Sequence, residues 1–226
     1  MSSPLSGRFW VIAMAAWLSI YTGNAYSAAE DNFGHFEGEV CTNWNDKDNR
    51  SMTLCAPFSF VDPENMHWDV PAGTVVDGAS IPQAFWSFIG GPFEGAYRKA
   101  SVVHDYYCEV HTRPWQAVHR MFYYGMLAGG TPATKAKVMY YAVLVGGPRW
   151  KTVLYTNHEP RAFPKPGDVD ETKVVPFAVE FDQRKTEEDA KWIEHNNPSL
   201  EDIEMRAKQA SRSIDEPRDR VRTDRK

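Results

Sequence analysis

The sequence lacks a marked excess of positive charge, and this absence excludes one broad class of function. Its 226 residues include 25 Lys and Arg against 30 Asp and Glu, so the formal net charge is −5 at pH 7. Proteins that bind nucleic acid through its phosphates normally carry a basic surface. We therefore expect no nucleic-acid partner.

Long apolar runs are also scarce, and the prominent one lies at the N-terminus. Arg8 precedes the apolar residues 9–21, and small residues follow at Ala25 and Ser27. A positive charge, a short apolar core and small residues in this order are typical of a cleavable secretory signal. The run is shorter than the roughly 20 residues that a membrane-spanning helix needs. We predict a signal peptide over residues 1–27, a periplasmic or secreted location, and no stable membrane span after cleavage.

Cysteine is rare, with three residues at Cys41, Cys55 and Cys108. In an oxidising compartment the natural pair is Cys41 with Cys55, because both lie in strand-like runs on either side of the turn-rich residues 45–49. Cys108 then remains unpaired. A buried, inert thiol is the common role of such a residue, and a metal ligand is the alternative.

The remaining pattern predicts an α+β fold, with a small antiparallel sheet followed by a cluster of three to four helices in a domain over residues 30–156. Alternating β-branched and aromatic residues predict strands over 36–44, 52–61 and 68–76. Helical spacing and capping residues predict helices over 80–89, 97–110, 112–127 and 131–146, with Thr112 as an N-cap.

Two further segments complete the predicted organisation. Residues 157–181 are rich in proline and charge and are interpreted as a linker, and residues 182–226 as a charged helical or disordered tail. Ser199 is predicted to cap a helix in this tail that has only a thin apolar stripe. This charged tail is a candidate binding site for a partner.

Two short polar segments are candidates for chemistry. Asp77 and Ser80 lie where the strands give way to helices, and His104-Asp105 interrupts an otherwise apolar helix. Adjacent residues on a helix point about 100° apart, so His104 and Asp105 face different neighbours. His119 falls in the next, antiparallel helix, where we expect it to meet His104.

Three interpretations of these residues stay open. In the first, His104 is a general base and Asp105 binds a cation such as calcium, with backbone carbonyls of residues 90–95. In the second, His104, His119 and a carboxylate, Asp105 or Asp77, bind a transition metal such as zinc, although no His-Glu-x-x-His signature is present. In the third, the group is a buried polar tie in which Asp77 accepts a hydrogen bond from His104 and Ser80 completes a cap.

The order of these motifs resembles a family of phage and bacterial domains of unknown function, numbered 1353. That family has an Asp-x-x-Ser-x-Pro turn, an apolar helix, a His-Asp-Tyr motif, an Ala-Asp-x-x-Phe helix and a Tyr-rich helix ending in Gly-x-x-Trp. The matching residues here are Asp77, Ser80 and Pro82; His104, Asp105 and Tyr106; Ala117 to Phe122; and Tyr140, Tyr141, Gly147 and Trp150. The resemblance covers residues 35–151 and implies a fold, but no activity.

The chain departs from that family at one position, because the aspartate of the second family helix falls at His119.

A helix with His-Asp that faces an antiparallel helix also has a distant geometric likeness to secreted phospholipase A2, where the histidine is a base and the aspartate binds calcium. The Cys-Cys-x-x-His-Asp-x-Cys run of that enzyme is absent, so this is an analogy.

The sequence therefore predicts an exported protein of an uncharacterised family. One hypothesis is a cation-assisted hydrolase that acts on envelope lipid, peptidoglycan or another extracellular substrate, with His104, Asp105, His119, Asp77 and Ser80 at its site. The other is a non-enzymatic envelope or phage-derived binding protein, in which the same residues form the buried polar tie. No Gly-x-Ser-x-Gly elbow, phosphate loop or dinucleotide fingerprint is present to indicate another chemistry.

Overall fold

The computed structural model describes residues 32–45, 51–78, 95–156 and 170–213. The predicted signal peptide and the helix predicted over residues 80–89 lie outside these ranges. Within them, no helix is both long enough and apolar enough to cross a membrane.

Six short strands form the predicted antiparallel β-structure, as two three-stranded sheets with the orders β1-β4-β5 and β2-β3-β6. Each of the three predicted strands contributes one strand to each sheet. The strands are β1 (His35–Glu37), β2 (Thr42–Trp44), β3 (Met52–Leu54), β4 (Phe58–Val61), β5 (His67–Val70) and β6 (Val75–Val76).

Glycine and proline cause these divisions. Gly38, between β1 and β2, has a φ of +82°, a conformation that L side chains rarely adopt. Pro57 separates β3 from β4, and Pro71 with Gly73 separates β5 from β6. Proline has no N–H to donate to a strand ladder, so each predicted strand stops and restarts at these residues.

The predicted disulfide between Cys41 and Cys55 is present, with the two Cα atoms 5.4 Å apart. It lies beside the β2–β3 hairpin, where the Cys55 N–H also donates to the Cys41 carbonyl at 2.9 Å. Cys108 is a free, buried cysteine, as the first interpretation of this residue expected.

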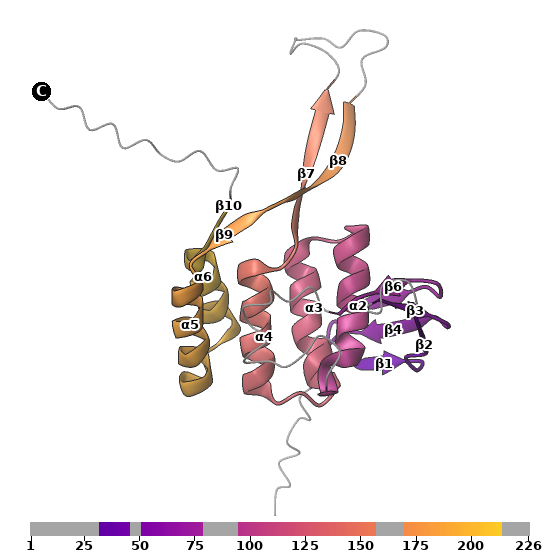
Figure 1. Cartoon of the computed structure of the whole chain (residues 1–226), viewed down its shortest axis with the longest axis horizontal. Helices are drawn as coiled ribbons and strands as arrows, with labels where there is room; N and C mark the ends of the chain where they lie inside the picture. Colours follow the sequence, from indigo (N-terminus) through magenta and orange to yellow (C-terminus); the bar gives the residue numbers. More distant parts are fainter. Residues whose placement is uncertain (1–31, 46–50, 79–94, 157–169, 214–226) are drawn as a thin grey trace, which may run out of the picture. The chain divides into compact units, whose positions relative to one another are not determined.

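Three helices follow the sheets, close to their predicted positions: α2 (Arg98–Val110), preceded by the short 3-10 helix η2 (Gly95–Tyr97), then α3 (Trp115–Ala128) and α4 (Ala133–Gly146). The prediction that Thr112 caps α3 is wrong. Pro114 occupies that position without a side-chain cap, because its ring already fixes a backbone angle suited to a helix start. Helix α2 packs against β4, β5 and β6 on one side and against α3 on the other (Figure 1).

Helix α4 forms the centre of the helical part. All residues from Val138 to Val145 are buried, and a helix that is apolar all round must be covered on every side. Helix α3 covers one side, and α5 (Gln183–Asn196) and α6 (Leu200–Ala210) cover another.

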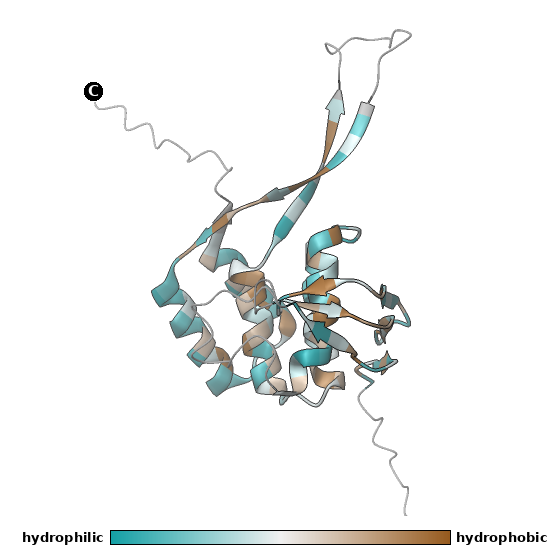
Figure 2. Cartoon of the chain, turned by 45° about the vertical axis from the view of Figure 1, so that its right-hand side comes forward, coloured by the Kyte–Doolittle hydropathy of each residue, from teal (hydrophilic) through white to brown (hydrophobic). Residues whose placement is uncertain are grey.

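The charged segment after residue 182 therefore differs from the predicted tail, because its first part packs into the fold. Helices α5 and α6 bury the small apolar set Ala190, Ile193, Ile203, Ala207 and Ala210 against α4. Apart from Asp189, their charged residues are exposed or half-buried, and Figure 2 shows the hydrophilic character of α5. Ser199 caps α6 as predicted, accepting from the Asp202 N–H at 3.1 Å.

Residues predicted as a linker include a long strand. β7 (Arg149–Thr156) pairs antiparallel with β8 (Asp170–Phe177) in a two-stranded ribbon, which we call the arm, and β9 (Val179–Phe181) pairs with β10 (Ser211–Ser213). The strands of the arm contact mainly each other. Pro176 is tolerated because a two-stranded ribbon has a free edge on each strand.

Asp189 anchors the C-terminal helices to α4, and its environment predicts a pH effect. Burial raises the pKa of this carboxyl, but hydrogen bonds from Tyr141, Lys185 and Arg206 outweigh burial and hold the pKa below its ordinary value of 3.8. Since the folded-state pKa is depressed, the stabilisation is complete above about pH 4 and is lost as the pH falls through the folded-state pKa.

We expect Asp189→Asn to lower the free energy of unfolding by about 2 kcal/mol at pH 7, because hydrogen bonds to a charged group are lost. The difference from the wild type should shrink below pH 4, where both side chains are neutral. Urea unfolding monitored by circular dichroism measures both effects. Glu188→Gln, at an exposed acid on the same helix, is the matched control, and a pH-independent difference would contradict the assignment.

Candidate functional site

His104 lies in the middle of α2, on the side that faces α3, and its side chain is fully buried. Its Nε2 atom lies 2.9 Å from Nδ1 of His119 on α3, so the predicted meeting of these two residues is confirmed. One of the two nitrogens must donate and the other must accept. The pair therefore joins α2 to α3 through a polar contact inside an apolar interface.

Aromatic rings enclose the pair. The Phe122 ring lies 4.6 Å from the His104 ring, and the Trp115 ring lies 5.4 Å from the His119 ring. Burial lowers the pKa of His104 to about 3. Burial also holds the pKa of His119 well below its ordinary value, with His104 and Arg149 lowering it further against an opposing effect of the Pro148 carbonyl. Both rings are therefore neutral at pH 7.

Asp105 faces a different neighbour, as its helical position predicted. Its carboxylate is buried and accepts the Gly78 backbone N–H at 2.6 Å, which fastens α2 to the turn that follows β6. Asp77 in the same turn is exposed, and Ser80 lies outside the described residues. The expected tie between helix and sheet is thus made by Asp105, whereas the nitrogen of His104 is directed to His119 and not to Asp77.

Cys108 completes the group around His104. It lies one helical turn further along α2, and its Sγ atom is 3.6 Å from Nε2 and 3.8 Å from Nδ1 of His104. One ligand atom from each of His104, Cys108 and His119 lies within 4.8 Å of the others, and all three residues are buried.

This set differs from the predicted metal set, in which Asp105 or Asp77 was the third ligand. Asp105 is rotated about 100° around α2 from His104, so it points to Gly78, whereas the i+4 spacing places Cys108 beside His104. That spacing is the signal in the sequence that places Cys108 beside His104. His111, seven residues after His104, is the C-cap of α2 with a φ of +53°, and its ring packs on Trp150 with the ring centroids 4.5 Å apart.

The calcium interpretation gains no support from the described residues. It required the Asp105 carboxylate to face the carbonyls of residues 90–95, of which residues 90–94 lie outside the described ranges. The carboxylate accepts a backbone N–H of the β6 turn instead.

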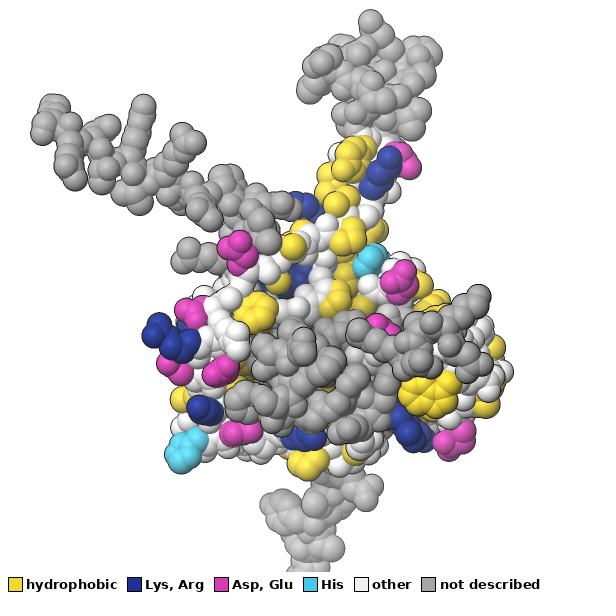
Figure 3. Space-filling model, viewed as in Figure 1, with side chains coloured by type: hydrophobic (Ala, Val, Ile, Leu, Met, Phe, Trp, Pro, Cys, Tyr) yellow, Lys and Arg dark blue, Asp and Glu magenta, His cyan; other side chains and the backbone are white. Residues whose placement is uncertain are grey.

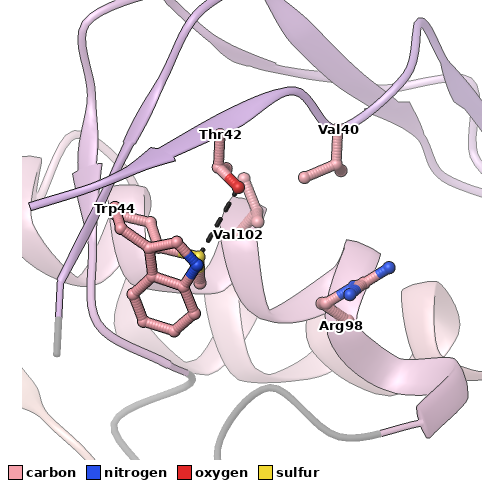
Figure 4. A pocket seen from close by; sticks show the side chains of 6 residues that line it. Val40, Thr42, Trp44, Arg98 and Val102 are labelled. Atoms are coloured by element: carbon pink, nitrogen blue, oxygen red, sulfur yellow. Dashed lines mark hydrogen bonds between the residues drawn. The ribbon is translucent and has the colours of Figure 1, made fainter. Parts of the chain in front are cut away.

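A separate hollow of about 220 Å³ lies between the β2–β3 hairpin and the start of α2, and the sequence gave no indication of it. Figure 4 shows Trp44 and Arg98 on either side of it, with the Thr42 hydroxyl contacting Met52 Sδ at 3.5 Å. It is lined by Val40, Thr42, Trp44, Met52, Arg98 and Val102. Among the described residues, this lining combines aliphatic and aromatic side chains with the Thr42 hydroxyl and the Arg98 guanidinium.

Comparison with known proteins finds a family model that matches the middle part of the chain. Residues 52–143 match the family described as protein of unknown function DUF1353. The resemblance predicted from the sequence is confirmed. This DUF1353 segment runs from β3 to α4 and contains His104, Asp105, Cys108 and His119.

Two curated relatives come from Sinorhizobium fredii (strain NBRC 101917 / NGR234), and both are uncharacterized. Protein y4jT is 50% identical over 145 residues, which are 64% of this chain and 43% of y4jT. Protein y4iH is 46% identical over 97 residues, which are 43% of this chain and 41% of y4iH. The matched segment thus spans less than half the length of each relative. No solved structure matches the chain.

The contact between Asp105 and Gly78 predicts a specific loss of stability. Asp105→Ala leaves the buried Gly78 N–H without this acceptor, which costs about 1–3 kcal/mol. Asp105→Asn keeps a side-chain carbonyl oxygen and should lose less. Urea unfolding of the two variants and of the wild type measures the difference in the free energy of unfolding. Equal stability of all three proteins would show that the contact between Asp105 and Gly78 does not stabilise the fold.

Proposed function

We propose that this chain is an exported, non-enzymatic protein of the cell envelope that binds a partner, and that its His-Asp motif is a buried structural tie. The observation that carries the proposal is the complete burial of both imidazoles, since His104 and His119 each expose 0% of their surface. A general base must come within hydrogen-bond reach of the proton it removes.

The pKa of His104 supports the same conclusion. A general base works best when its pKa lies near the working pH, and burial lowers the pKa of His104 to about 3. In the distant analogy with phospholipase A2, the adjacent aspartate is a calcium ligand. Here the Asp105 carboxylate accepts a backbone N–H inside the fold.

The arm supports a binding role. Its exposed side chains include Leu154 at 61%, Tyr155 at 47% and Val174 at 43%, and Figure 3 shows hydrophobic side chains along it. An isolated two-stranded ribbon is marginally stable in water, and both faces of this one expose large apolar side chains that a partner could cover. The arm is therefore the part of the described chain best suited to a protein partner.

The disulfide supports the exported location. Disulfides such as Cys41–Cys55 persist mainly in oxidising compartments, and the N-terminal residues have the order of charge, apolar core and small residues that a signal peptide needs.

Replacing His104 distinguishes the structural tie from a catalytic site. We expect His104→Ala to lower the free energy of unfolding by about 3 kcal/mol, because it leaves a cavity and removes the partner of His119. Thermal unfolding measures this loss, and hydrolysis of ester, phospholipid and peptidoglycan substrates is assayed in parallel. Turnover by the wild type that disappears in a variant of unchanged melting temperature would establish the hydrolase instead.

The location has its own test. Expressed in a Gram-negative host, the full chain should appear in the periplasm, with a mass that lacks residues 1–27. Replacing the apolar residue Ile12 with Asp should keep the protein in the cytoplasm at full length, because the apolar core of a signal is needed for export. Full-length wild-type protein in the cytoplasm would refute export.

A further inference from the structure

We propose that His104, Cys108 and His119 form a transition-metal site, and that zinc is the ion that it takes. This inference goes beyond the proposed function, which requires only that the two histidines contact each other. The site lies at the crossing of α2 and α3, and two of its three members come from the same helix.

The three donor atoms lie within 4.8 Å of one another, close to the spacing that one small ion requires. In zinc sites the bonds to nitrogen are about 2.0–2.1 Å and the bond to sulfur is about 2.3 Å, in a tetrahedral arrangement. Donor atoms of such a site therefore lie roughly 3.3–3.6 Å apart. His104 Nε2 lies 2.9 Å from His119 Nδ1 and 3.6 Å from Cys108 Sγ. Small rotations of the side chains would open the space between the two imidazoles.

The chemistry of the donors selects the ion. Two imidazole nitrogens and one thiolate are the ligand types that zinc and similar borderline ions prefer, whereas calcium and magnesium require oxygen ligands. His104, Cys108 and His119 include no carboxylate. The site thus differs from the predicted calcium site in the nature of its donors as well as in its residues.

Each neutral imidazole binds the ion through one lone pair. The ring that donates in the His104–His119 contact must therefore carry its proton on its other nitrogen when the ion is bound. The Cys108 thiol loses its proton to solvent as the sulfur–metal bond forms. The bound ion and the thiolate together leave one net positive charge, and three protein ligands leave a fourth position for a water molecule.

The surrounding residues hold the ligands in position. The i,i+4 spacing directs His104 and Cys108 to the same side of α2, and the rings of Phe122 and Trp115 pack against the two imidazoles. A metal bound there would join α2 to α3 more strongly than the single contact between the histidines. Zinc binding should therefore raise the stability of the folded protein, because the unfolded chain lacks the assembled site.

Cobalt provides a direct spectroscopic test. The full chain is treated with a chelator, the chelator is removed, and Co²⁺ is added under mildly reducing conditions that keep the Cys41–Cys55 bond intact. We expect one equivalent to bind, with the visible bands of tetrahedral cobalt and a thiolate-to-cobalt band in the near ultraviolet. Zinc should then displace the cobalt and abolish both signals.

Three variants identify the ligands. Cys108→Ser should lose the thiolate band, and His119→Asn should weaken cobalt binding at least tenfold. The matched control is His111→Asn, because His111 is the C-cap of the same helix, lies outside the cluster, and has a positive φ that asparagine tolerates. The control should give the wild-type spectrum. Absence of a one-to-one cobalt spectrum in the wild type, or a thiolate band that persists in Cys108→Ser, would overturn the proposal.

A measurement on the wild type alone covers the case in which the variants fail to fold. Cys108 is the free cysteine of the chain, so alkylation by iodoacetamide reports on it. One equivalent of zinc should slow this alkylation at least tenfold, and an unchanged rate would also overturn the proposal. These outcomes do not depend on hydrolase assays, so failure of the metal site is distinguishable from failure of the proposed function.

Discussion

The pairing of two uncharged imidazoles inside the α2–α3 interface is the constraint on which the other parts of the fold depend. A buried ring nitrogen needs a polar partner, so the 2.9 Å contact between His104 and His119 fixes how far the two helices slide past each other. Helix α2 contacts the sheets through Asp105 and through its apolar side chains, and α3 packs against α4. The polar contact therefore lies at the junction between the sheets and the remaining helices.

Arg149 links this contact to the rest of the molecule. Its guanidinium stacks on Trp115, donates to the Ser211 hydroxyl at 2.8 Å and also donates to the Leu144 carbonyl. One side chain thus joins the first residue of β7 to α3, α4 and β10. The positive charge of Arg149 also lowers the pKa of His119. Arg149 therefore helps to keep the buried His119 ring neutral.

Much of this arrangement was predictable from the sequence, and the errors have physical causes. The meeting of His104 and His119, the Cys41–Cys55 bond and the positions of α2, α3 and α4 all follow from spacing and turn residues. The packing of α5 and α6 was missed because their apolar stripe is thin. This stripe stabilises the fold only because α4 offers an apolar surface for it to pack against. Its buried residues include Ala190, Ile193, Ile203 and Ala207. The arm was missed because the proline and charge content of residues 157–181 suggested a linker, whereas a free strand edge tolerates a proline such as Pro176.

Histidine at position 119 supports the proposed metal site over acid–base chemistry. In the family that the sequence resembles, an aspartate falls at this position, and a carboxylate opposite His104 would stabilise a protonated imidazole. Histidine removes that charge, and Arg149 and burial oppose any charge on its ring. Two neutral lone-pair donors then lie beside the Cys108 sulfur in a dry interface, a combination poorly suited to taking a proton from water and well suited to binding a soft or borderline cation.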